Sequence, residues 1–240
     1  MIKTAKLIGI CEKGIEFAKR AEESGLNRIK LELIEDKKDV DKEYVRTLLD
    51  DIDILYLAFS SAERRAIEIV KAIGFMASER KVLCIGFDVN SEKAIKIDEI
   101  DRYVPVKHEE LEELVKMMDM TATSIADDIM INLDITDLRD VMITEKGIKY
   151  SYIEADYSEN ADRILELVDE NTKEDGEEFL LKKCIAIIEG KTEGENGIDL
   201  SSISEIMEKL GEKCSDRGYS IFAIIPNDEA EKMSMTVFYN

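Results

Sequence analysis

Two aspartates near the middle of the chain stand where a loop is expected to pass into a helix. Asp134 and Asp137 are three positions apart, and the apolar spacing predicts a helix from about Thr136 to Met142. Carboxylates placed in this way could aim at one point, as proton transfer or the positioning of a reactant requires. In a structural interpretation, Asp134 caps the helix and Asp137 faces its positive N-terminal dipole. Both interpretations remain open.

Two glycines after the first apolar run frame a candidate phosphate-binding loop. Gly9 and Gly14 enclose Cys11, but the Lys-Ser/Thr pair that completes a P-loop is absent. A phosphate cradle needs small residues, so that backbone N–H groups can close on the anion. Glu12 and Glu16 bring negative charge there instead. The pattern favours a strand-to-helix turn that uses two glycines.

Ser60 and Ser61 mark a second position where a phosphate loop could lie. They follow the apolar segment Ile52–Phe59, and no glycine is present to free the backbone for close approach to an anion. Ser60 and Glu63 have the spacing of a capping box, in which each side chain accepts a backbone N–H of the other residue. An ordinary helix start is therefore predicted here.

The metal-binding residue types show no pattern of a metal or redox site. The four cysteines contain no C-x-x-C pair, and the first three stand in apolar runs, where a free thiol behaves as a small buried hydrophobe. They are Cys11, Cys84, Cys184 and Cys214. The single histidine, His108, lacks the second histidine of a zinc-protease helix. We expect no metal site.

The charge of the chain limits its partners. The formal net charge is -21 over 240 residues, and such a field repels phosphate backbones and anionic lipid. Nucleic acid and direct membrane binding are therefore not expected. No apolar run approaches the roughly 18 to 20 residues that span a bilayer, and Leu7–Cys11 is too short for a signal-peptide core. The sequence predicts a cytoplasmic location.

The first half of the chain alternates apolar runs with amphipathic stretches. Predicted strands are Ala5–Cys11, Arg28–Ile34, Ile52–Phe59, Val82–Phe87 and Tyr103–Val106. Predicted helices are Lys13–Ser24, Asp41–Leu49 and Glu63–Met76. Strands that are apolar throughout and alternate with helices indicate a parallel sheet covered on both faces.

A long helical stretch from Glu109 to about Met130 precedes a change of pattern. Predicted strands then follow at Ile148–Glu154, Lys183–Glu189, Tyr219–Pro226 and Lys232–Phe238, with helices at Asn160–Asp169 and Ser201–Lys213 and a polar connector at Glu170–Glu177. This order suggests a mixed α+β layer. We therefore predict an α/β protein with a parallel Rossmann-like N-terminal domain (1–108), a central helix (109–131) and a smaller mixed-sheet C-terminal domain (132–240).

The segment Asn132–Met142 resembles a hallmark of FtsZ, a member of the FtsZ/tubulin superfamily. FtsZ carries N-L-D-F-A-D-V there, followed after two residues by V-M. Further passages resemble FtsZ in the same order, at Tyr152–Ala161, Ile187–Gly190, Ile221–Ile225 and Met235–Phe238. The resemblance covers most of 109–240. The first half matches in the order of its elements, but the loops that are glycine-rich and bind nucleotide in FtsZ are degenerate here.

The resemblance implies two sets of site residues. In FtsZ and tubulin filaments, the acidic loop of one subunit enters the nucleotide site of the next and helps position the attacking water. The matching acidic-loop positions, acting in trans, are Asn132, Asp134 and Asp137. The positions that match the family's nucleotide pocket, here vestigial, are Gly9, Cys11, Gly14, Ser60 and Ser61.

A chain that retains the acidic loop but has degenerate nucleotide-binding loops is predicted to be an assembly or regulatory module related to cell division. Such a module would lack normal GTP binding and hydrolysis and would need no cofactor. Its expected partner is FtsZ, or further copies of this chain, through longitudinal filament contacts. One alternative is a divergent filament-forming GTPase that binds GTP through non-family contacts. Another is a scaffold that holds a different small ligand at the carboxyl edge of the sheet.

Overall fold

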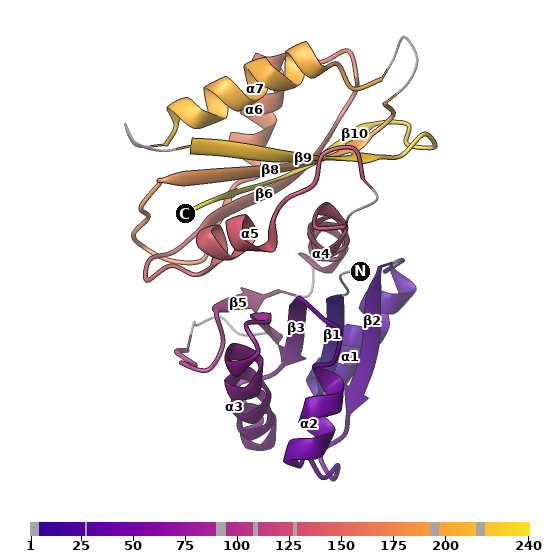
Figure 1. The fold of residues 1–240 in the computed structure, drawn as a ribbon, viewed down its shortest axis with the longest axis vertical. Helices are drawn as coiled ribbons and strands as arrows, with labels where there is room; N and C mark the ends of the chain where they lie inside the picture. Colours follow the sequence, from indigo (N-terminus) through magenta and orange to yellow (C-terminus); the bar gives the residue numbers. More distant parts are fainter. Residues whose placement is uncertain are drawn as a thin grey trace. The chain divides into compact units, whose positions relative to one another are not determined.

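The protein divides into two compact units, each built around its own sheet. The computed structural model describes residues 5–26, 28–89, 95–107, 110–126, 129–192, 197–214 and 219–240. The units are Met1–Ala122 and Thr123–Asn240, shown in Figure 1 with their helices and strands.

The first unit contains, among the described residues, a five-stranded parallel sheet. Its strands are β1 (Ala5–Ile10), β2 (Ile29–Ile34), β3 (Ile54–Phe59), β4 (Leu83–Val89) and β5 (Arg102–Val106). Their spatial order is β2-β1-β3-β4-β5, and neighbouring strands run parallel. The accompanying helices are α1 (Cys11–Glu23), α2 (Lys42–Leu48), α3 (Arg64–Glu79) and α4 (Leu111–Ser124).

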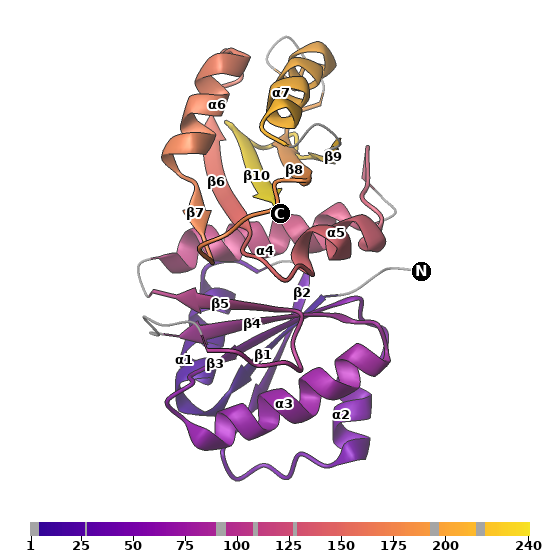
Figure 2. The same cartoon turned by 90° about the vertical axis from the view of Figure 1, so that its left-hand side faces the viewer.

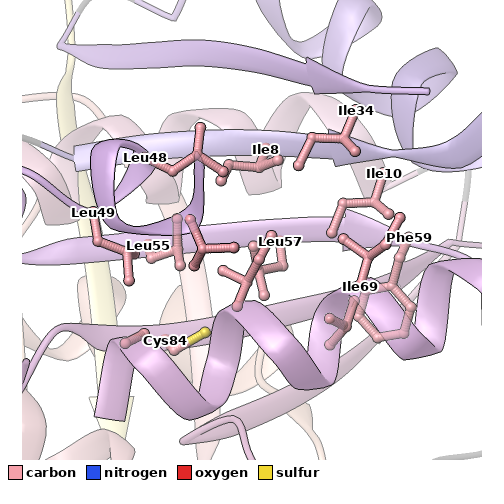
Figure 3. Packing of buried hydrophobic residues seen from close by; sticks show 14 of the residues in the cluster. Ile8, Ile10, Ile34, Leu48, Leu49, Leu55, Leu57, Phe59, Ile69 and Cys84 are labelled. Atoms are coloured by element: carbon pink, nitrogen blue, oxygen red, sulfur yellow. The ribbon is translucent and has the colours of Figure 1, made fainter. Parts of the chain in front are cut away.

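Helices cover both faces of this sheet, which explains why β3 is buried along its whole length. Leu55 and Leu57 of β3 point into the core beneath α2 and α3 (Figure 3), and these two helices lie side by side in Figure 2. The intervening Tyr56 points to the opposite face, where its ring stacks on Phe87 at 5.7 Å between centroids. Phe17 of α1 lies 6.1 Å from the same Phe87 ring.

The second unit contains a mixed sheet. Its strands are β6 (Lys149–Ala155), β7 (Lys173–Glu174), β8 (Lys183–Gly190), β9 (Tyr219–Pro226) and β10 (Met233–Tyr239). In the order β7-β6-β10-β8-β9, only β8 and β9 pair in parallel among the described residues. Helices α6 (Ala161–Glu170) and α7 (Leu200–Glu212) lie on one face, and α5 (Ile135–Met142) lies on the other (Figure 1). The predicted fold class is confirmed.

Two elements differ from the sequence-based prediction. Helix α4 ends at Ser124 and does not continue to Met130. Beyond it, Ile131 joins the sheet of the second unit through a bridge to Ile224 of β9, with N···O distances of 2.9 and 3.4 Å. The connector Glu170–Glu177 contains the two-residue strand β7, which pairs with the start of β6 and has no apolar pattern to reveal it.

Leu57→Ala is expected to destabilise the first unit by about 2–5 kcal/mol, because it opens a cavity in a fully buried core. Urea unfolding followed by circular dichroism measures the change. Leu200→Ala is the matched control, since that side chain is 51% exposed and its truncation should change the free energy of unfolding by less than about 0.5 kcal/mol. Equal effects of the two substitutions would contradict the assigned core.

Candidate functional site at the carboxyl edge of the parallel sheet

The sequence-predicted pocket residues lie at the carboxyl ends of β1 and β3. Cys11 is the first residue of α1 and follows β1 without an intervening loop. Its φ of 57° is in the left-handed region, which costs a non-glycine residue about 1–3 kcal/mol. Ser60 and Ser61 follow β3, the strand beside β1. This edge is where ligands of parallel α/β sheets bind, because the strand ends and helix N-termini face it together.

Gly9 and Gly14 allow α1 to approach the sheet closely. A Cβ on Gly14 would lie 2.0 Å from the carbonyl oxygen of Ala58, and a Cβ on Gly9 would lie 2.7 Å from the Cβ of Ala18. Both distances are below any normal contact, so the helix packs against β3 only because these side chains are absent. The packing of α1 accounts for both glycines.

Internal carboxylates accept hydrogen bonds from the backbone donors at this edge. The N–H of Lys13, in the first turn of α1, donates to Oε1 of Glu63 at 3.3 Å. The N–H of Ser61 donates to Oδ1 of Asp88 at 2.8 Å. Asp88 is fully buried and also accepts a hydrogen bond from the hydroxyl of Tyr103. Protein oxygens thus occupy positions at a helix N-terminus and a loop where an anionic ligand would find its donors.

The predicted capping box at Ser60 is wrong. Helix α3 begins at Arg64, and its N-cap is Glu63, whose side chain makes no capping hydrogen bond. The Glu63 carboxylate reaches across to α1 instead. Ser60 Oγ accepts a hydrogen bond from the N–H of Ala62 at 3.4 Å, within the turn that precedes the helix.

Sequence analysis did not assign Asp36 and Asp88 to this edge. Asp36 follows β2, and Asp88 is the last residue but one of β4. The signal that could have found them is an acidic residue near the end of a buried strand, because parallel strands bring such positions to one edge. His108, examined in the sequence as a metal ligand, lies outside the described residues.

A cavity of about 260 Å³ lies beside α1, and neither Asp36, Glu63 nor Asp88 lines it. It is bounded by α1, the ends of β4 and β5, and the start of α4. Its lining residues are Lys13, Glu16, Phe17, Arg20, Val89, Val106, Lys107 and Leu111. Three cations lie around this cavity in a chain with a net charge of -21. Nζ of Lys13 is paired with the Glu16 carboxylate at 3.1 Å, so Lys13 adds less than Arg20 and Lys107 to a field that favours a small anion.

The acidic-loop residues belong to the second unit. Asp134 is the N-cap of α5, and its carboxylate accepts a hydrogen bond from the N–H of Thr136 at 2.7 Å. Asp137 stands in the first turn of the same helix. The predicted capping role of Asp134 is therefore confirmed. Asn132 and Asp134 are exposed, whereas Asp137 is half-buried. A role of these residues in trans catalysis stays a prediction.

Helix α5 is tied to the sheet of its unit at its C-terminal half. Nζ of Lys183, from β8, lies 2.5 Å from a carboxylate oxygen of Asp140. The side-chain amide of Asn240 donates to the backbone carbonyl of Asp140 at 3.0 Å, and its Oδ1 accepts the N–H of Lys183 at 3.0 Å. These contacts hold the acidic N-terminus of α5 in a defined position on its sheet.

Comparison with solved structures identifies the fold. The chain superposes on an empty FtsZ dimer structure from M. jannaschii with a TM-score of 0.68 and 11% identity, covering 100% of this chain and 88% of that one. CetZ from Methanosaeta thermophila superposes with a TM-score of 0.70 and 10% identity, covering 100% of this chain and 86% of that one. TubZ in GDP-form protofilaments from Bacillus thuringiensis serovar israelensis superposes with a TM-score of 0.62 and 9% identity, covering 99% of this chain and 86% of that one. The protein has the FtsZ/tubulin-like fold.

At the level of sequence, no family model and no curated protein matches the chain. Among the described residues, no helix combines the length and the apolar character needed to cross a membrane.

Gly14→Ala is expected to destabilise the protein by about 1–3 kcal/mol, because the added methyl overpacks the contact between α1 and β3. Denaturant unfolding measures the effect. Gly211→Ala in α7 is the matched control: its new Cβ would lie 3.3 Å from Oγ of Ser220, the end of a side chain that can shift, so the stability should change by less than about 1 kcal/mol. If Gly14→Ala were as stable as the parent, close packing would not explain the glycine.

Proposed function

We propose that this protein is an FtsZ-like assembly module that regulates filaments in the cytoplasm and does not bind GTP in the family's usual way. The hydrogen bond from the Lys13 N–H to the Glu63 carboxylate carries the proposal. It places a fixed negative charge at the N-terminus of α1, where the FtsZ resemblance would put a phosphate. An anion cannot take that position unless Glu63 moves away.

Electrostatics add to this steric conflict. Asp36 and Glu63 lie together beside Cys11 at the start of α1. A phosphate about 4 Å from one carboxylate meets a repulsion of about 1 kcal/mol in water and about 4 kcal/mol near a protein surface. Two carboxylates therefore offset much of the roughly 8 kcal/mol that micromolar affinity requires.

The acidic residues at the start of α5 support the other part of the proposal, which is docking on a filament. Asp134 and Asp137 stand at the N-terminus of a helix held to its sheet, at positions that match the loop by which an FtsZ subunit contacts the next nucleotide. A subunit with these residues, but with a blocked nucleotide face, would dock at one end of a filament and not accept a further subunit. Capping of FtsZ filaments follows from that asymmetry.

A second candidate function is favoured by the cation-lined cavity beside α1. Lys13, Arg20 and Lys107 could hold an anionic ligand, including a nucleotide bound through contacts unlike those of the family. The cavity of about 260 Å³ lies below the roughly 300–1,000 Å³ of most ligand sites. A whole nucleoside triphosphate would therefore extend beyond it, and we rank this function second.

Titration calorimetry of the purified protein with GTP and Mg²⁺ is expected to show no binding up to about 1 mM, which corresponds to less than about 4 kcal/mol of affinity. An FtsZ sample in the same buffer is the positive control. A micromolar dissociation constant that is weakened by Lys107→Ala would contradict the proposal and support the second function.

In a sedimentation assay of FtsZ polymerising with GTP, substoichiometric amounts of this protein are expected to lower the mass of pelleted FtsZ. The double variant Asp134→Asn, Asp137→Asn should lose this effect. Asparagine caps helices about as well as aspartate, so the variant removes charge but keeps the cap.

The matched control is Asp228→Asn with Glu229→Gln, which removes two exposed carboxylates from the turn between β9 and β10 of the same unit. It should act on FtsZ like the parent. If the parent protein neither changes FtsZ sedimentation nor pellets by itself, the assembly function is wrong. If both double variants lose activity equally, general charge and not the acidic loop is responsible.

A further inference from the structure

Three possible metal ligands meet at the carboxyl ends of three neighbouring strands. Cys11 follows β1, Asp36 follows β2, and Glu63 precedes α3 in the turn after β3. The Cys11 Sγ and one carboxylate oxygen from each acid all lie within 4.8 Å of one another. The sheet order β2-β1-β3 explains the meeting, because it brings together residues far apart in the chain.

We propose that Cys11, Asp36 and Glu63 form a binding site for a thiophilic divalent cation of the zinc type. The site shares Asp36 and Glu63 with the proposed block of the nucleotide position, but it lies within the first unit, so its test needs no filament assay.

An unsatisfied buried oxygen points to a missing partner at this cluster. Glu63 Oε1 accepts the N–H of Lys13, but Glu63 Oε2 has less than 1 Å² of accessible surface and no hydrogen-bond partner in the described residues. A buried carboxylate oxygen without a partner is costly, because it has lost its water and gained nothing in return. A cation bound between the Cys11 sulfur and the acids would supply that partner. Cys11 itself is only 1% exposed.

The ligand set selects the class of metal. A thiolate with two carboxylates suits Zn²⁺, whereas Mg²⁺ and Ca²⁺ prefer sites made entirely of oxygen ligands. Zinc–ligand bonds of about 2.0–2.3 Å place tetrahedral ligands about 3.5 Å apart. The three atoms, now within 4.8 Å, need to close by about 1 Å. Exposed Asp36 lies in the connector after β2 and is the ligand best able to move.

Binding requires the loss of one proton. Burial first, and then the hydrogen bond to Asp36, raise the pKa of the Cys11 thiol to about 12. The negative charges of Asp36 and Glu63 act in the same direction, and Arg65 of α3 opposes them. The incoming cation forms a bond to sulfur, and the thiol proton leaves to solvent. Only the thiolate binds the cation, so metal binding should release one proton.

The protein, freed of metal and kept reduced, is titrated with Co²⁺ and with Zn²⁺. We expect one equivalent of Co²⁺ to produce a sulfur-to-cobalt charge-transfer band, and Zn²⁺ to displace it. Cys11→Ser should abolish the band. Asp36→Asn and Glu63→Gln should weaken binding by at least about 10-fold, because the loss of even an outer-shell partner of a metal site costs about 10- to 100-fold. Calorimetry at several pH values should show release of one proton.

Matched controls are Cys214→Ser, which removes a half-buried thiol from the other unit, and Glu68→Gln, which removes a carboxylate from α3. Both should bind like the parent. Circular dichroism melts without metal test the folding of each variant. Exposed Asp36 gives a variant that should remain folded even if Cys11→Ser does not.

The proposal is overturned if the parent shows no charge-transfer band, or if the band persists in folded Cys11→Ser. It is also overturned if Mg²⁺ competes as well as Zn²⁺, since the cluster would then be only an acidic patch. Each result is obtained without FtsZ, so it is independent of the filament assay.

Discussion

The close contact between α1 and β3 at Gly14 determines the geometry of the first unit's functional edge. The helix lies so near the sheet that a methyl group on this residue would reach the Ala58 carbonyl. Helix α1 therefore starts directly at the end of β1, and Cys11 takes a left-handed conformation to make the turn. The first free N–H groups of the helix are thereby presented to Glu63 from the next strand's loop. No backbone remains between strand and helix to wrap around an anion.

The electrostatic character of this edge follows from that geometry. A helix N-terminus carries a partial positive charge and attracts whatever anion is nearest. Here the nearest anion is part of the protein, and the buried Asp88 serves the loop after β3 in the same way. The edge completes most of its hydrogen bonds internally. Its acids gather at the start of α1, while cationic side chains gather around the cavity on the flank of the helix.

This chain and the solved structures share a fold although only about one residue in ten is identical, because the fold places only general requirements on the sequence. A parallel sheet needs apolar strands and helices that bury one face, and many sequences satisfy these conditions. Binding of a particular ligand needs specific groups at the edge, which can change without disturbing the core. The similarity to FtsZ, CetZ and TubZ therefore describes the scaffold, whereas function depends on the side chains that the scaffold carries.

Local patterns in the sequence were sufficient for the two-part α/β architecture, the buried cysteines and the cap at Asp134. Each depends on neighbours within a few positions, whose periodicity or capping chemistry is visible in one dimension. The end of α4, the strand β7 and the role of Glu63 were decided by tertiary structure. In each case the partner that matters, β9, β6 or the start of α1, lies far away in the chain. The cluster of Cys11, Asp36 and Glu63 has the same origin: three unremarkable residues become neighbours only because parallel strands bring their carboxyl ends to one edge.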